Sequence, residues 1–74
     1  MKMSVLDLCM VISAGSNVIV DATDMSTLDM RSIASNAKMS GTHVTIRNAS
    51  LLSLLDCRTI AMAGGKGTVT FDFT

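Results

Sequence analysis

The sequence predicts an α/β fold, a small right-handed βα repeat in which helices and strands alternate as α-β-α-β-α-β. The three strands are expected to form a parallel sheet with the helices on one face. Three observations indicate this fold. A Ser-x-Leu-Asp motif occurs three times, beginning at Ser4, Ser26 and Ser53. Each motif is followed by apolar residues at helical spacing, and each such segment by a short run of β-branched or aromatic residues.

The Ser-x-Leu-Asp motif is typical of the first turn of a helix. A serine at the N-cap accepts a hydrogen bond from the backbone N–H three residues later, and an aspartate there complements the helix dipole. The motifs thereby account for three of the six acidic residues. The apolar residues that follow recur at i, i+3, i+4 and i+7, on one helical face. They are Leu8, Val11, Ile12 and Gly15; Met30, Ile33, Ala34 and Ala37; and Cys57, Ile60, Ala61 and Gly64.

Turn-forming residues end each predicted helix, and a strand follows. The turns are Gly15-Ser16-Asn17, Ser40-Gly41 and Gly64-Gly65-Lys66-Gly67, and the strands are Val18–Val20, Val44–Ile46 and Val69–Phe73. The first residues of consecutive strands are 26 and 25 positions apart. Strands joined through helices run parallel, with right-handed crossovers. We therefore expect a single domain over residues 1–74, with repeat units at about 1–17, 18–43 and 44–74.

Alternation along the strands predicts two sheet faces of different character. One face is wholly apolar and should lie under the helices; it holds Val18, Val20, Val44, Ile46, Val69, Phe71 and Phe73. The other face is polar except for Ile19, which indicates that helices do not cover it, because parallel strands buried on both sides are apolar throughout.

Solenoid proteins bind partners through an uncovered sheet face. The candidate binding residues are Asn17, Asp21, His43, Thr45, Arg47, Thr70 and Asp72. In register, Arg47 would lie between Asp21 and Asp72 as a charge ladder across the strands. The alternative is that this face is only solvated, with Arg47 paired to both aspartates for a modest gain in stability.

The ends of the predicted repeat favour self-association. The third strand has no helix after it, so its edge, with Val69, Phe71 and Phe73, is open to pairing. Three units are about the minimum for a repeat fold, and neither end carries a polar cap. The net charge of zero gives no repulsion between copies. We expect a homo-oligomer, most simply a two-fold dimer joined through the third strands or the apolar ends; alternatively, the chain is a fragment of a longer repeat protein.

Two known families share parts of this pattern. Val18-x-Val20-x-x-Thr23-x-Met25 and Val44-x-Ile46-x-x-Ala49-x-Leu51, with a shortened copy over 69–74, resemble the leucine-rich repeat, although Thr23 and Ala49 stand where that family has asparagine. This resemblance implies a binding solenoid. The segment from Val18 to Asp29 resembles the strand-loop-helix region of STAS domains, the fold of anti-sigma-factor antagonists. That resemblance implies a regulator phosphorylated on serine, for which Ser26 and Ser32 are the nearby residues, although Met30 stands at the family's serine position.

Composition argues against several classes of function. Six basic residues balance six acidic ones, so no positive field attracts nucleic acid or an anionic membrane. The apolar stretches are too short for a membrane span. Cys9 and Cys57, far apart in the chain, are expected to be reduced and buried, which favours a cytoplasmic location. One histidine and two separated cysteines make a metal site improbable, and no cofactor is expected.

The sequence contains no recognisable catalytic arrangement. Gly64-Gly65-Lys66-Gly67-Thr68 follows a predicted helix and precedes a strand, the reverse of a phosphate-binding loop. We therefore predict a small non-catalytic protein-interaction or assembly module that binds an unidentified protein through the polar sheet face or the open edge strand. The alternatives are a STAS-like regulator and a small enzyme that uses His43.

Overall fold

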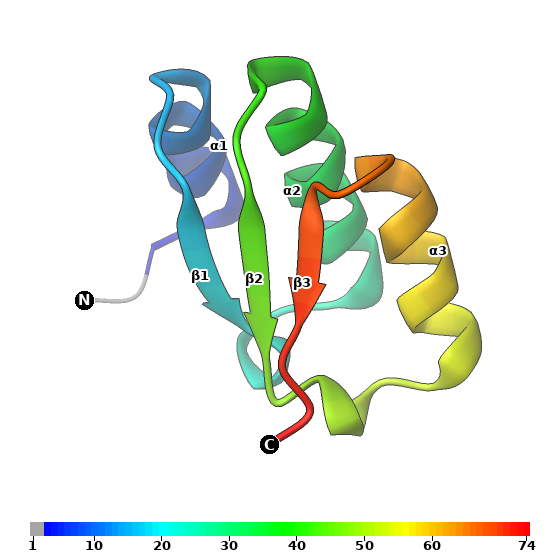
Figure 1. The fold of residues 1–74 in the computed structure, drawn as a ribbon. Coiled ribbons are helices and arrows are strands. Elements are labelled where there is room, and N and C mark those ends of the chain that lie inside the picture. Colours follow the sequence, from blue (N-terminus) through cyan, green and yellow to red (C-terminus); the bar gives the residue numbers. More distant parts are fainter. Residues whose placement is uncertain (1–2) are drawn as a thin grey trace.

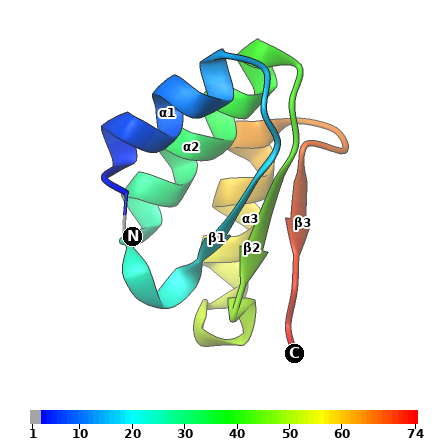
Figure 2. The ribbon, with the colours of Figure 1, turned by 90° about the vertical axis from the view of Figure 1, so that its left-hand side faces the viewer.

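The computed structural model describes residues 3–74, so the first two residues of the predicted first unit lie outside it. Helices α1 (Val5–Ser13), α2 (Thr27–Ser40) and α3 (Leu54–Gly64) alternate with strands β1 (Val18–Asp21), β2 (Val44–Arg47) and β3 (Val69–Phe71). The strands are parallel in the order β1-β2-β3. The helices form one layer and the sheet another (Figures 1 and 2). The predicted fold class is confirmed.

Each helix begins at its Ser-x-Leu-Asp motif. Ser4, Ser26 and Ser53 are the N-caps, and each hydroxyl accepts a hydrogen bond of 3.1 Å from the backbone N–H of the motif's aspartate. These bonds satisfy backbone donors that have no partner inside the helix. At the other end, α2 closes on Gly41, whose φ of 69° is the left-handed conformation that glycine adopts without strain.

The strand bounds differ slightly from those predicted. Strands β1 and β2 each continue one residue further, to Asp21 and Arg47. The prediction for the third strand was wrong at its end, because β3 stops at Phe71 and not at Phe73. Asp72, the first residue after the strand, is still bonded to neighbouring segments: its N–H donates to the Ile46 carbonyl and its carbonyl accepts from the Ala49 N–H, both at 2.9 Å. Short 3₁₀ turns not foreseen in the sequence, Ala22–Asp24 and Ala49–Leu51, follow β1 and β2.

The hydrophobic core lies between the helix layer and one face of the sheet. Its buried members are Ile12, Val20, Met30, Ile33, Ala34, Ala37, Val44, Ile46, Ala49 and Ile60. The apolar sheet face predicted from alternation therefore points under the helices. It is best buried on β2 and in the middle of β1. On β3, an edge strand, Val69 and Phe71 are half-buried. Phe73, placed on this face by the prediction, lies beyond the strand and is 58% exposed.

Candidate functional site

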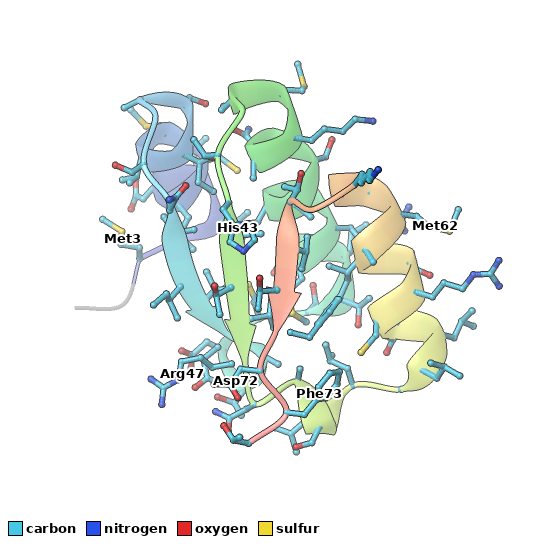
Figure 3. All side chains as sticks on the ribbon, in the orientation of Figure 1. Met3, His43, Arg47, Met62, Asp72 and Phe73 are labelled. Carbon is cyan, nitrogen blue, oxygen red and sulfur yellow. The ribbon has the colours of Figure 1, made fainter. Side chains whose placement is uncertain are left out.

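The face of the sheet that the helices leave bare is the candidate site (Figure 2). Its residues come from all three strands and the positions directly beside them, and we call them the open face: Asn17, Ile19, Asp21, His43, Thr45, Arg47, Thr70 and Asp72. The register places Ile19, Thr45 and Thr70 in one row and pairs Asp21 with Arg47. The sticks of Figure 3 show His43 over the sheet and Arg47 and Asp72 near the carboxyl ends of the strands.

His43 joins the amino ends of all three strands. Its backbone N–H donates to the Asn17 side-chain oxygen at 2.8 Å. Its ring Nδ1 lies 3.1 Å from the Gly67 carbonyl oxygen, and its Nε2 lies 2.5 Å from Thr70 Oγ1. Because a carbonyl oxygen only accepts, Nδ1 carries the proton of this pair. The ring is therefore held in one orientation by the turn before β3 and by β3 itself.

The aspartates at the carboxyl ends of the strands bind their own chain segments. Asp21 accepts from the backbone N–H of Thr23 at 2.9 Å and from the Thr23 hydroxyl at 2.7 Å. Asp72 accepts from the N–H of Thr74 at 3.0 Å and also from the Thr74 hydroxyl. The same Asp-x-Thr turn thus occurs after the first strand and after the third. The repeated spacing was visible in the sequence and would have indicated it.

Asn48 is a further member of this end of the sheet that the sequence analysis missed. Its side-chain N–H donates to Asp21 Oδ2 at 2.8 Å. Its backbone φ of 56° is the single left-handed conformation among the non-glycine residues that the structure describes. Asparagine tolerates this conformation better than most side chains. An asparagine directly after a strand was the available signal.

The strand register places Asp21 opposite Arg47, but the predicted charge ladder is not formed by ion pairs. Among the described residues, neither Asp21 nor Asp72 forms a salt bridge with Arg47, which is exposed. The physical reason is local. A carboxylate bound by a threonine two residues away orders little additional chain, whereas an exposed arginine must give up side-chain entropy for a small Coulomb gain. Arg47 is left as a cation on the open face.

Hydrogen bonds set the acidity of both aspartates. The Thr23 N–H, the Asn48 side chain and the Thr23 hydroxyl together lower the pKa of Asp21 to about 2, with a smaller contribution from the charge of Arg47. The Thr74 hydroxyl and N–H lower the pKa of Asp72 in the same way. Both groups are therefore charged acceptors at neutral pH.

Replacing Asp21 by asparagine should flatten the acid side of the stability profile. The folded-state pKa of Asp21 lies below its ordinary value, so the carboxylate stabilises the fold above that value, and this contribution is lost as the pH falls from about 5 to about 2. The variant should be less stable than the wild type at neutral pH and should converge with it in acid. Urea unfolding at a series of pH values tests this, and parallel profiles for the two chains would contradict it.

Apolar surface accompanies the charged residues at the β1 side of the open face. Ile19 is 69% exposed in the middle of β1. A shallow hollow of about 370 Å³ lies beside it, and its walls include Met3, Met25, Asp21 and Arg47. The open face therefore offers a cation, fixed polar groups and an apolar contact within one surface.

The structure brings together no set of groups for metal chemistry among residues 3–74. Cys9 and Cys57 are free and half-buried, and burial, with the charge of Asp56, raises the pKa of the Cys57 thiol. The His43–Thr70 pair lies on an exposed sheet surface, and a reaction there would proceed without exclusion of water. In the described part of the chain, no helix combines the length and the apolar character needed to cross a membrane.

The serines relevant to the STAS resemblance have local partners. The hydroxyl of Ser26 caps α2, and that of Ser32, exposed on the same helix, donates to the Leu28 carbonyl at 3.2 Å. Comparisons of the chain with protein-family models, with curated proteins and with solved structures found no match. The resemblances to the leucine-rich repeat and to STAS domains therefore stay predictions.

Proposed function

We propose that this chain is a small non-catalytic protein-interaction module that binds a partner protein through the open face. One observation carries the proposal: a complete sheet face is bare of helices while five of its polar side chains are already held by hydrogen bonds, those of Asn17, Asp21, His43, Thr70 and Asp72. A surface ordered before binding loses little conformational entropy on association. The half-buried free thiols are consistent with a reducing, cytoplasmic setting as part of this proposal.

Arg47 is the residue expected to contribute most to partner binding. It is exposed and has no ion pair with either neighbouring aspartate of the described chain, so it can meet a carboxylate of the partner without breaking an existing contact. Ile19 of β1, which lines the same hollow as Arg47, supplies apolar area. The partner surface that fits is therefore one with an acidic side chain beside an apolar one.

Reversal of the charge at Arg47 should abolish most of the binding. The experiment compares immobilised wild type, Arg47→Glu and Arg31→Glu in extracts of the cells that express the chain, with retained proteins quantified by mass spectrometry. Arg31 is exposed on α2, in the helix layer. A protein specific to the open face should be retained by wild type and by Arg31→Glu. Its affinity for Arg47→Glu should be lower by a factor of at least about ten, equivalent to about 1.4 kcal/mol of binding free energy. Equal retention by all three chains, each with unchanged circular dichroism, would refute the proposal.

A further inference from the structure

The middle helix, α2, shows what an inner interface of this repeat requires. Toward α1, the side-chain oxygen of Asn36 accepts a hydrogen bond of 3.0 Å from Ser13. Toward α3, Ala34 and Lys38 lie beside Gly64 and Gly65, where an added Cβ would be 3.5 Å from each. Helical spacing extends these two sides of α2. Asp29 and Ile33 share the side of Asn36, and Thr27 and Arg31 share that of Ala34 and Lys38.

Comparison of equivalent positions shows that α1 and α3 each have one side that no neighbouring helix covers. Seven residues after the N-cap serine, Ile33 and Ile60 are 1% and 0% exposed, whereas Val11 of α1 is only half-buried. Eight residues after the serine, Ile12 and Ala34 are both 0% exposed, whereas Ala61 of α3 is half-buried. The outer side of α1 is thus incompletely buried at Val11, and the outer side of α3 is incompletely buried at Ala61.

The first helical position completes this pattern. Val5 and Thr27, on the sides of α1 and α2 that face the next helix, are half-buried, but the equivalent Leu54 of α3 is 87% exposed. Figure 3 shows further apolar side chains at both ends, with Met3 beside β1 and Met62 on the outer side of α3. Both are exposed, at 38% and 69%.

The edge strands and the charged residues at the two ends of the molecule are also complementary to each other. β1 and β3 are the edges of the parallel sheet, and the chain contains no proline to block pairing there. The outer side of α1 carries Asp7, and that of α3 carries Arg58, both exposed. At the inner contact between α2 and α3, the position equivalent to Arg58 is Arg31 of α2, and the position equivalent to Asp7 is Asp56 of α3.

We propose that copies of this chain stack end to end, with the α3–β3 end of one copy on the α1–β1 end of the next. The occupant is a second copy, because the two ends are the two halves of an interface that the molecule already forms between α1 and α2 and between α2 and α3. Such a contact is heterologous, so association continues beyond a dimer or closes into a ring. A two-fold dimer through two β3 strands, in contrast, leaves every α1–β1 end uncovered.

Two single substitutions block the two ends separately without harming the fold. Leu54→Asp places a charge on the α3 end and an acid in the first turn of a helix, where it is favourable. Ala14→Lys places a charge on the α1 end and a cation at the C-terminus of that helix, which is also favourable. Both residues are exposed, whereas Asn36 and Ala63, the equivalents of Ala14, are half-buried by neighbouring helices.

The decisive experiment is sedimentation velocity over a dilution series. Wild type should increase in mass beyond that of a dimer as its concentration rises, and each blocked variant alone should remain a monomer. An equimolar mixture of the two variants should form a heterodimer and stop there, because one intact end is left on each chain. The control, Leu28→Asp, places the same charge on an exposed leucine in the first turn of α2, one residue after Thr27, the equivalent of Leu54, and should associate like the wild type.

The outcomes that overturn the proposal are equally specific. A monomeric wild type at all concentrations does so, as does a dimer that Ala14→Lys leaves intact, which would indicate the two-fold arrangement. A second readout concerns charge: stacking in register places Asp72 opposite Asp21 of the next copy, and these like charges oppose association. Asp72→Arg should therefore lower the concentration of half-assembly by up to about fivefold, and an unchanged or raised concentration contradicts the predicted register.

Discussion

Replacement of Ile46 by alanine should lower the free energy of unfolding by about 2–5 kcal/mol, the range for deletion of a fully buried aliphatic side chain. Ile46 is 1% exposed. It lies in the central strand, opposite Val20 of β1 and Phe71 of β3, so the cavity would open beneath both neighbours. Since a small domain has only about 5–15 kcal/mol of total stability, we expect a large fraction of the variant to be unfolded at 37 °C.

Ile19→Ala provides the matched control for this prediction. It removes the same atoms from the same sheet, but Ile19 is 69% exposed and points away from the helices, so the loss should be below about 1 kcal/mol. Urea unfolding followed by circular dichroism measures both. The chains must be compared at one low protein concentration, because self-association adds to the apparent stability. Equal losses for the two variants would contradict a core placed on one side of the sheet.

The fold followed from the sequence because several local signals agreed. The three N-cap serines, the apolar spacing after each and the strand alternation all predicted the same arrangement, and each signal depends on groups only a few residues apart. The bare second face was also predictable, since polar residues at His43, Thr45 and Arg47 are incompatible with a sheet covered on both sides. These residues belong to the open face in the structure.

The details of the open face could not be predicted in this way. Its charges suggested a ladder of ion pairs. The partners of the aspartates are determined instead by the turns that follow the strands. Thr23 and Thr74 reach the aspartates two residues before them, and the left-handed backbone of Asn48 directs its amide at Asp21. Competition between such local hydrogen bonds and exposed ion pairs depends on small free-energy differences, to which a pattern of residue types is insensitive.

The end of β3 shows a second limit. Alternation placed Phe73 on the same buried face as Phe71, since apolar residues at every second position are typical of a strand. In the structure the chain turns at Asp72, and the Phe73 ring stacks on that of Phe71 at a centroid distance of 6.0 Å. The Asp72 carboxylate holds this turn through Thr74. A capping interaction therefore overrides strand periodicity at the last residues of the repeat.

Replacement of Gly64 by alanine should destabilise the protein by about 1–3 kcal/mol, the usual cost of excess volume in a packed interior. In most helix positions this change would stabilise, since glycine is about 1 kcal/mol worse than alanine. Gly64 is buried at the end of α3, however, and a Cβ there would lie 2.6 Å from Val69 Cγ2. The close approach of α3 to β3 is therefore possible only because residue 64 has no side chain. Urea unfolding of the variant measures the loss.

Removal of the opposing methyl group should rescue much of that loss. In Gly64→Ala combined with Val69→Ala, the clashing Cγ2 is gone, so the double variant should be more stable than the sum of the single changes predicts, with a coupling of about 1–2 kcal/mol. Gly41→Ala serves as the control, because nothing lies within 4 Å of its Cβ position and its cost arises from a φ of +69°. Its effect should add to that of Val69→Ala without coupling. If Gly64 behaved additively as well, the contact with Val69 would not be the reason for glycine at this position.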